Sequence, residues 1–525
     1  MKRNHGIALI ATVAAAIIGI FIWGTNRQPT DNIIRQDNQQ QPGAITQQDS
    51  QQQADTTGSP TDKPIRTLSI LTHRGNEAAI RQAVFAMYMD RLEMNNPYTF
   101  RVSRDFHSRH AMSFEDKEAI ATRLRVELMA GQGPDIIMLC PWFFTMGALD
   151  FHSLVNSGFI RDIYTLMDTD PGTDRDEFFP QALSAFEINN GLYSFPVSFG
   201  FQYLGINTSL PQDFIERFTG KAYITFLDMM AFYLDLMEEH PDEFGHLSFG
   251  TGGSLNMWSS VVQAVMCEFI DFDTRRSSLT DPCFADALEL MGKVYTYWEE
   301  PCIEVWVALS YRSLSHELMQ KLAQEVVFHN QSSSINNFYA FFDTEESFFR
   351  HHIPIVDEQG RLLIYQDGLR GQIWNQVLIT AGNNADLAWE LTRYLAYAFA
   401  NPEGEALRCP EWRVEVEWGN NSLATPIMRS LFEDHTRRSF EQIFNTWSLS
   451  MQAFVGMEDP TNRARLFDNA TRRIAAYNGQ PMRMLHPMIP NRLIEEHLDQ
   501  FMIGLIDAQT AAQRMHNAVS LWLIE

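Results

Sequence analysis

The chain has 525 residues, too many for one compact core, so two or more lobes are expected. Its net charge of -25 excludes binding to nucleic acid or to an anionic membrane surface through a basic face. Aromatic residues make up 12% of the chain, which serves either a large core or stacking surfaces for a ligand.

The first residues predict export. Lys2 and Arg3 precede an apolar run from Gly6 to Trp23 that is just long enough to span a bilayer. No small-residue cleavage site follows this run, and no cysteine follows it for a lipid anchor. We expect residues 1–23 to form an uncleaved membrane anchor, with a cleaved signal segment as the alternative.

A polar, low-complexity stretch follows the apolar run. Residues 24–65 are rich in Gln, Asn, Asp, Thr, Ser and Pro, with runs at Gln39–Gln41 and Gln51–Gln53. Such a composition cannot bury a core, so we expect a disordered tether with an end-to-end span of roughly 35 Å.

Strand and helix patterns begin at Thr67. Thr67–Thr72 is strand-like, and Ile80, Val84 and Met87 mark one face of a helix. A second strand is predicted at Tyr98–Val102, and Ile120, Leu124 and Leu128 mark the next helix.

The stretch Ala130-Gly-Gln-Gly-Pro-Asp135 predicts an abrupt helix end. Gly131 suits a left-handed residue just past the helix, and Pro134 forbids its continuation. Ile136–Leu139 then reads as a strand buried on both faces. The order β-α-β-α-β predicts an open, doubly wound sheet, in which ligands lie beyond the carboxyl ends of the strands. These ends are His73–Asn76 and Cys140–Phe144.

Four further segments follow in a recognisable order. They are Asn189–Asn207, Glu325–Asn330, Ile379–Glu390 and Gly504–Ala512. Together with Ala130–Ile136 they resemble family 1 of the extracellular solute-binding proteins of ABC importers, the sugar-binding group that includes maltose-binding protein. Leu192 stands where the family usually has lysine, and Gly205-Ile206 interrupts the usual Tyr-Asn pair.

The resemblance implies a two-lobe α/β fold of the periplasmic-binding-protein type II, each lobe a doubly wound, mostly parallel sheet. Lobe one would comprise residues 66–198 and 333–378, and lobe two residues 199–332 and 379–525. The chain would cross between the lobes near residues 197–202, 328–332 and 380.

The resemblance and the strand ends together select nine candidate ligand-binding residues. Each of them has a structural alternative, as a turn-shaping residue or a packing residue. The candidates are Arg74, Asn76, Trp142, Phe143, Asn256, Trp258, Ser332, Ser333 and Trp374. Aromatic faces suit the C–H faces of a sugar ring, and planar polar side chains suit its hydroxyls.

Other features predict no chemistry. Asp271-Phe-Asp273 lacks the glycine and distal glutamate of a calcium loop, and His107 with His110 lacks a third metal ligand. No nucleophile elbow and no P-loop is present. We therefore expect no catalytic residues, no metal and no cofactor. The five cysteines do not have the spacing of a metal site. The sequence does not decide whether Cys283 and Cys302 form a disulfide.

The sequence thus predicts a non-enzymatic, monomeric receptor outside the bacterial cell membrane, which would deliver a solute, most simply a carbohydrate or oligosaccharide, to ABC transporter permease subunits. One alternative is an exported carbohydrate-active enzyme, which would need two carboxylates across a cleft. The other is a sensor or interaction protein on the same fold.

Overall fold

The computed structural model describes residues 66–72, 114–138, 149–250, 255–297, 326–332, 349–365, 376–400, 425–432, 479–484 and 489–524, with isolated residues between them. The predicted anchor (1–23) and tether (24–65) lie outside these ranges. Within the described ranges, no helix combines the length and the apolar character needed to cross a bilayer.

The first half of the chain contains helices and mostly short strands. They are β1 (Ile70–Thr72), α3 (Phe114–Met129), β2 (Ile136–Met138), α5 (Phe151–Asn156), α6 (Ile163–Thr169), η2 (Arg175–Glu177), α7 (Pro180–Ser184), β3 (Glu187–Ile188), β4 (Gly191–Leu192), β5 (Phe195–Pro196), β6 (Ser198–Asn207), α8 (Gln212–Thr219), α9 (Phe226–Glu239), α10 (Pro241–Phe244), β7 (Ser248–Gly250) and α11 (Leu255–Met266).

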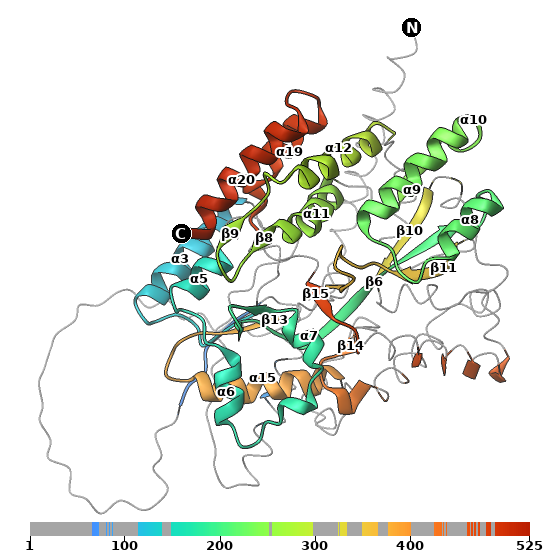
Figure 1. The fold of residues 1–525 in the computed structure, drawn as a ribbon. Coiled ribbons are helices and arrows are strands. Elements are labelled where there is room, and N and C mark those ends of the chain that lie inside the picture. Colours follow the sequence, from blue (N-terminus) through green and yellow to red (C-terminus); the bar gives the residue numbers. More distant parts are fainter. Residues whose placement is uncertain are drawn as a thin grey trace, which may run out of the picture. The chain divides into compact units, whose positions relative to one another are not determined.

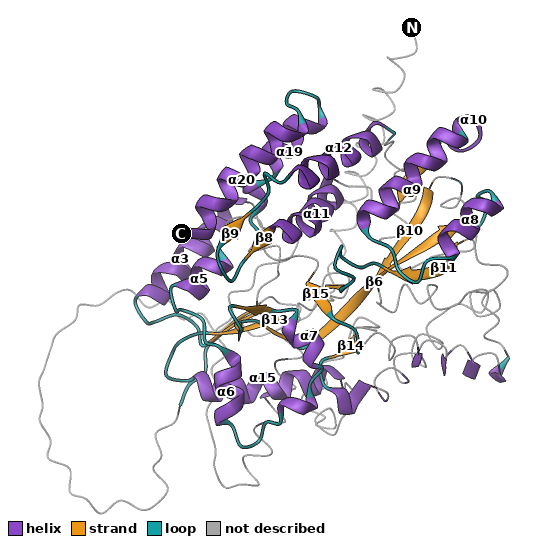
Figure 2. Cartoon of the chain, in the orientation of Figure 1, coloured by secondary structure: helices purple, strands orange, loops and turns teal. Residues whose placement is uncertain are grey.

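The second half continues in the same manner. Its elements are η3 (Cys267–Phe269), β8 (Ile270–Asp271), β9 (Arg276–Ser277), α12 (Pro282–Thr296), β10 (Val326–Ser332), β11 (Phe349–Pro354), β12 (Leu362–Tyr365), β13 (Gln376–Ile379), α15 (Ala385–Ala400), β14 (Thr425–Pro426), η7 (Arg429–Leu431), β15 (Met482–Met484), η8 (Asn491–Leu493), α19 (Glu495–Met502) and α20 (Ala508–Ile524) (Figures 1 and 2).

The first sheet has the order β1-β2-β13-β5. β1 and β2 pair in parallel, as the sequence predicts, with Ile70 opposite Ile136. β13 pairs antiparallel with both β2 and β5, so the sheet is mixed. The predicted strand at residues 98–102 lies outside the described residues. The buried stripe of α3 is confirmed, because Ile120, Leu124 and Leu128 are all buried.

The abrupt end of α3 occurs where the sequence predicts it. Gly131 has φ +67°, in the left-handed region. A Cβ atom at Gly133 would lie 2.6 Å from Leu128 Cδ2, so a larger residue would collide with the helix it follows. The strand that begins at Ile136 is fully buried.

Asp135 ties this turn to two distant segments. Its Oδ2 accepts hydrogen bonds of 2.7 Å from both the backbone N–H and the hydroxyl of Ser69, which precedes β1. Its Oδ1 accepts one of 3.0 Å from Nδ2 of Asn384, just before α15. One carboxylate therefore fixes the start of β1 and the start of α15 relative to β2.

The second sheet has the order β15-β12-β6-β10-β7, with β11 and β14 also paired to β6. β6 is antiparallel to β10, and β10 is parallel to β7. β6 is the long strand on which the sheet is built in Figures 1 and 2. Four strands form hydrogen-bonded pairs with β6 along its length, namely β14, β12, β10 and β11.

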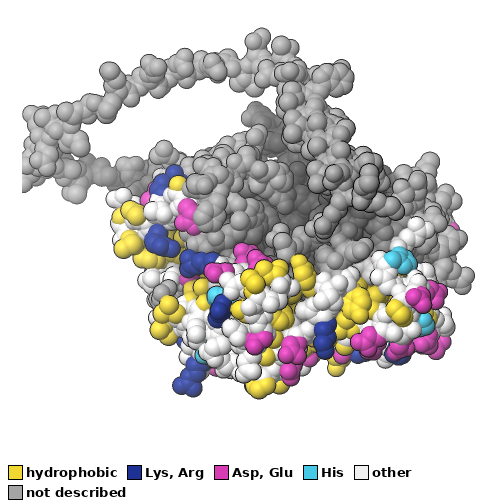
Figure 3. Space-filling model, turned by 90° about the horizontal axis from the view of Figure 1, so that it is seen from above, with side chains coloured by type: hydrophobic (Ala, Val, Ile, Leu, Met, Phe, Trp, Pro, Cys, Tyr) yellow, Lys and Arg dark blue, Asp and Glu magenta, His cyan; other side chains and the backbone are white. Residues whose placement is uncertain are grey.

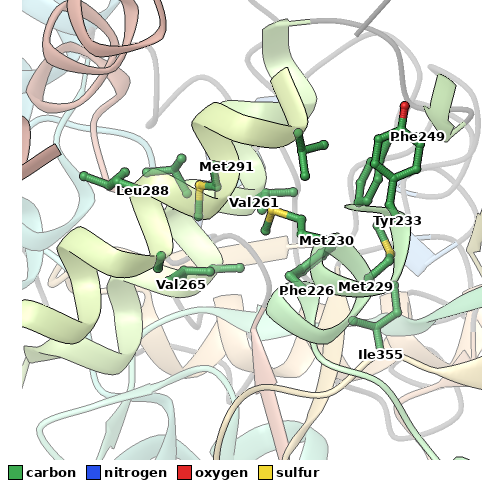
Figure 4. Packing of buried hydrophobic residues seen from close by; sticks show 14 of the residues in the cluster. Phe226, Met229, Met230, Tyr233, Phe249, Val261, Val265, Leu288, Met291 and Ile355 are labelled. Carbon is green, nitrogen blue, oxygen red and sulfur yellow. The ribbon is translucent and has the colours of Figure 1, made fainter. Parts of the chain in front are cut away.

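The two halves of β6 pack in two different hydrophobic cores. Phe199, Phe201 and Tyr203 pack in what we call the first core, with buried residues of β5, α7 and α15. Leu204 and Ile206 pack in the second core, with α8, α9, α11, α12 and α20. Figure 4 shows part of the second core, where side chains of α9, α11 and α12 meet. Both faces of β6 are buried because successive side chains of a strand point to opposite faces.

Two segments pack differently from the lobe boundaries expected above. α15 was expected in lobe two, but its Leu387, Trp389 and Leu391 are buried in the first core. β11 and β12 were expected in lobe one, but both pair with β6 in the second sheet. The family pattern places the crossings by analogy, whereas packing of apolar side chains decides which core a segment joins. The division into two lobes stays a proposal.

We predict that Asp135→Ala lowers the free energy of unfolding by about 2 to 3 kcal/mol, because it removes the acceptor for three donors. The matched control is Asp168→Ala, whose carboxylate makes an exposed ion pair with Arg175 and should cost less than about 1 kcal/mol. Urea denaturation of the full chain measures both. Equal effects would contradict a structural role for Asp135.

Candidate functional site

The carboxyl ends of β1 and β2 lie at one edge of the first sheet. β1 ends at Thr72, level with Met138 at the end of β2. β13 runs antiparallel to β2, so its first residue, Gln376, lies at this same edge. Gln376 is opposite Pro196, where β5 ends. The chain leaves the first sheet from this edge.

Gln376 is an unusual residue for its position. Its side chain is fully buried, and neither its Oε1 nor its Nε2 has a hydrogen-bond partner among the described residues. An unpaired buried polar group costs about 1–3 kcal/mol, so such groups mark places where a polar partner belongs. A buried amide with open donor and acceptor capacity therefore sits at the predicted ligand edge.

The chain that leaves the first sheet after β5 continues into the second sheet as β6. There it passes the carboxyl end of β10. β7 and β10 are parallel and end at Gly250 and Ser332. Ser332 is opposite Gln202 of β6. Pro196 of the first sheet is separated from Gln202 by Val197 and by residues 198–201, the first part of β6, which pair with β14 and β12. We call the region between the two carboxyl edges the crevice.

Three of the nine candidate residues belong to described elements of the second sheet and its helices. Asn256 and Trp258 lie in the first turn of α11, directly after β7, and Ser332 ends β10. The positions of their side chains are not described. Arg74, Asn76, Trp142, Phe143, Ser333 and Trp374 lie outside the described residues. All nine assignments stay predictions.

A cavity of about 640 Å³ lies elsewhere in the described structure, between segments of the two cores. One wall comes from α5, the end of α7 and the β3–β4 hairpin. The other comes from η3, the β8–β9 hairpin, the turn at residues 357–361 and β15. The volume is in the range of small-molecule sites. None of the nine candidate residues is among its described lining residues.

The floor of this cavity is a network of two acids and two arginines. Arg483 contacts Glu268 and lies 3.4 Å from Oδ2 of Asp357. Arg361 Nε donates to the same Oδ2 over 2.6 Å. Gln359 Nε2 donates to Glu268 over 3.0 Å. Burial raises the pKa of Glu268, and the neighbouring Arg483 opposes that shift. The two positive and two negative charges balance.

One wall of the cavity is aromatic. The rings of His152 (α5) and Phe272 (β8–β9 hairpin) are stacked, with centroids 5.1 Å apart. Trp522 of α20 meets His152 edge-on at 4.9 Å, and its indole N–H donates to Asp150 over 2.5 Å. Asp150 also caps α5 by accepting from the N–H of His152 and Ser153. These contacts hold the β8–β9 hairpin and α20 against α5.

The β8–β9 hairpin is polar at its tip. Oδ1 of Asp273 accepts a hydrogen bond of 2.9 Å from the N–H of Asn189, a left-handed residue of the β3–β4 turn. Arg275 donates to Asn156 over 2.9 Å. Within the described residues, no group of His, Cys, Asp and Glu side chains is placed to hold a metal ion.

Sequence reasoning missed the charged floor. Glu268, Asp357, Arg361 and Arg483 come from three separated segments, and only tertiary pairing brings them together. A weak signal exists in Asp357-Glu-Gln-Gly-Arg361, a tight turn with Gly360 at φ +76°, in which Asp357 accepts from the N–H of Arg361. Nothing in the sequence connects this turn to Arg483.

No family model and no curated protein matches the sequence. Solved structures similar to this chain include the sugar-binding protein MalE of Xanthomonas citri, with 14% identity, a TM-score of 0.49 and coverage of 87% of this chain and 98% of that one. Another is the cyclic alpha-maltosyl-1,6-maltose binding protein of Arthrobacter globiformis, with 14% identity, a TM-score of 0.45 and coverage of 87% and 99%.

A third similar structure is an extracellular solute-binding protein family 1 member from Alicyclobacillus acidocaldarius, with 14% identity, a TM-score of 0.43 and coverage of 88% and 100%. These proteins belong to the class that the sequence motifs resemble.

Two cysteines are described, and both are thiols. Cys283 is exposed and free, and Cys302 lies outside the described residues. Cys267 lies behind the cavity floor, and burial raises the pKa of its thiol to about 11, with Arg483 opposing the shift.

We predict that iodoacetamide at pH 8 labels Cys283 in the folded chain while Cys267 reacts only after unfolding, because the buried thiol is neither accessible nor ionised at that pH. Peptide mass spectrometry with and without urea measures both sites. Rapid labelling of Cys267 without denaturant would show that the cavity floor opens readily.

Proposed function

We propose that this protein is an extracytoplasmic solute-binding receptor that delivers its ligand to an ABC importer. The observation that carries the proposal is the crossing at β6. The carboxyl edges of the two sheets, at Pro196 and Ser332, meet the same short segment of chain. A ligand in this crevice would touch both halves of the molecule.

Hinge closure follows from that arrangement. The crossing includes residues 198–201 of β6, which pair with β12 and β14, and a rotation of the two cores about this strand would leave the packing within each core unchanged. A solute that contacts both edges binds the closed form better than the open form, and this difference in affinity drives closure. The receptor alters no covalent bond of its ligand, so it needs no catalytic group.

The proposed ligand is a carbohydrate or an oligosaccharide. The predicted edge residues Trp142, Phe143, Trp258 and Trp374 supply aromatic faces, and Asn76, Asn256 and Ser332 supply hydrogen-bonding groups. The buried amide of Gln376 adds a donor and an acceptor to that edge. Acidic and basic side chains are interspersed on the face in Figure 3, which offers no broad basic surface to a polyanion.

The membrane partners belong to the proposal as well. Residues 1–23 would anchor the receptor, and the Gln-rich stretch of residues 24–65 would let it reach a permease in the same membrane. An exported enzyme or a sensor on this fold would use the same crevice, so the tests below include turnover of the ligand.

We predict that a thermal-shift screen over oligosaccharides, peptides and other solutes yields a carbohydrate that raises Tm. Trp142→Ala and Trp258→Ala should each weaken binding of this hit about tenfold or more in calorimetry, because each removes a stacking face. Tyr223→Ala, which removes an exposed aromatic ring on the α8–α9 connection, should leave the affinity unchanged.

Two outcomes would count against the receptor. If both tryptophan variants kept full affinity and the parental melting temperature, these residues would be outside the site. If the hit were consumed on incubation, as followed by chromatography, the exported-enzyme alternative would replace the receptor.

A further inference from the structure

The cavity between the β3–β4 hairpin and the β8–β9 hairpin is a formed site that the proposed function leaves unused. Its volume is about 640 Å³. The side chains of its floor are well ordered by pairing: Glu268 is 9% exposed and Arg483 is 14% exposed. A fixed polar floor of this kind is typical of ligand sites rather than of surface irregularities.

One wall residue has polar capacity that the protein does not use. Ser194, between β4 and β5, is 1% exposed, and its Oγ has no hydrogen-bond partner among the described residues. A buried hydroxyl without a partner is unfavourable in the free protein. Because Ser194 lines the cavity, a bound molecule can supply the missing hydrogen bond.

The charges around the cavity exclude an anion. The described lining carries four carboxylates, on Glu187, Glu268, Asp271 and Asp273, against three guanidinium groups, on Arg276, Arg361 and Arg483. Two of the guanidinium groups are already paired with Glu268 and Asp357, and the third, Arg276, lies opposite Asp271 in the β8–β9 pair. The described lining therefore carries one more carboxylate than guanidinium groups, which disfavours a phosphate or carboxylate ligand.

The carboxylates are also engaged, which disfavours selection of a cation. Glu187 accepts from the Tyr164 hydroxyl over 2.5 Å. Asp271 accepts from the N–H of Thr274 over 2.9 Å, and Asp273 accepts from that of Asn189. Each carboxylate still has lone pairs for further weak donors, because two oxygens accept up to about four hydrogen bonds. Ligand hydroxyls fit this pattern of many weak partners.

The aromatic wall completes the chemistry. The stacked pair of His152 and Phe272 presents ring surface beside these polar groups, and Phe186 and Phe269 also line the cavity. A ligand with an apolar C–H face and a rim of hydroxyls satisfies both kinds of wall. The available volume suits one or two sugar rings.

We propose that this cavity is a second ligand site, additional to the crevice, that binds a neutral polyhydroxylated molecule of monosaccharide or disaccharide size. The ligand forms a hydrogen bond, as donor or acceptor, with the Ser194 hydroxyl on one wall. Its own hydroxyl groups donate hydrogen bonds to the carboxylates of the other wall. Because the walls come from segments of both cores, the occupant would link the β3–β4 hairpin to the turn at residues 357–361.

The test uses the full chain and four probes: maltose and myo-inositol as neutral polyhydroxylated molecules, citrate as an anion and putrescine as a cation. Isothermal titration calorimetry should show saturable binding of at least one neutral probe and none of citrate or putrescine. Ser184→Trp, which places a large ring at the exposed mouth, should abolish this binding.

Ser194→Ala is the decisive variant. It should weaken the neutral probe at least fivefold while the melting temperature of the free protein stays the same or rises, because an unpartnered buried hydroxyl is removed. The control variant is Ser209→Ala. It removes a hydroxyl that donates a hydrogen bond to Asn207, the last residue of β6, and it should leave probe binding unchanged.

The outcomes separate this site from the crevice. Binding that Trp258→Ala removes and Ser194→Ala leaves intact would overturn the cavity proposal and keep the receptor. Binding that Ser194→Ala removes and Trp258→Ala leaves intact supports the cavity, whatever the fate of the crevice. Binding of citrate or putrescine in place of the neutral probes, or no binding of any probe, would also overturn the cavity proposal.

Discussion

The first half of β6 packs in one hydrophobic core through Phe199, Phe201 and Tyr203, and its second half packs in the other through Leu204 and Ile206. Phe199, Phe201, Leu204 and Ile206 are all fully buried. A shift of β6 by one residue would turn each of these side chains away from the core that it fills. The register of β6 with β10, β11 and β12 therefore fixes how the two packed bodies are joined, and the crevice and the cavity both depend on this join.

The two candidate sites differ in what forms them. The crevice is defined by backbone topology, because strands of both sheets end at the segment of chain that crosses between them. The cavity is defined by side chains, chiefly the network of Glu268, Asp357, Arg361 and Arg483. A half-buried network of this kind contributes geometry more than stability, since desolvation offsets much of the Coulomb attraction. Such fixed groups suit recognition of hydroxyls, whose hydrogen bonds need defined directions.

Local sequence signals predicted local structure well. Gly131 and Pro134 predicted the end of α3, and the apolar run after Asp135 predicted a buried strand, because both effects act within a few residues. The sequence could not show that the Asp135 carboxylate holds Ser69 and Asn384, which are distant along the chain. The lobe boundary at residue 379 stays a prediction, and the sequence pattern of α15 did not show that its Leu387, Trp389 and Leu391 pack in the first core.

The candidate sites likewise combine local features that the sequence could predict with distant contacts that it could not. The end of a predicted buried strand pointed to Trp142, and the resemblance to the solute-binding family pointed to Trp258. The cavity floor needs Arg483 to meet Asp357 across 126 positions, and no pattern in either segment encodes that meeting. The burial of Ser194 without a partner is equally invisible in the sequence, since serine between β4 and β5 is an ordinary turn residue.

Closure of the two cores around a solute is the central claim, and a distance measurement tests it most directly. In a chain whose exposed Cys283 is replaced by serine, spin labels on cysteines introduced at Asp168 of α6, near the first core, and at Glu289 of α12, near the second core, report the separation by pulsed electron paramagnetic resonance. Saturation with the carbohydrate found by screening should shift and narrow the distance distribution. An unchanged distribution in the presence of a saturating ligand would contradict hinge closure.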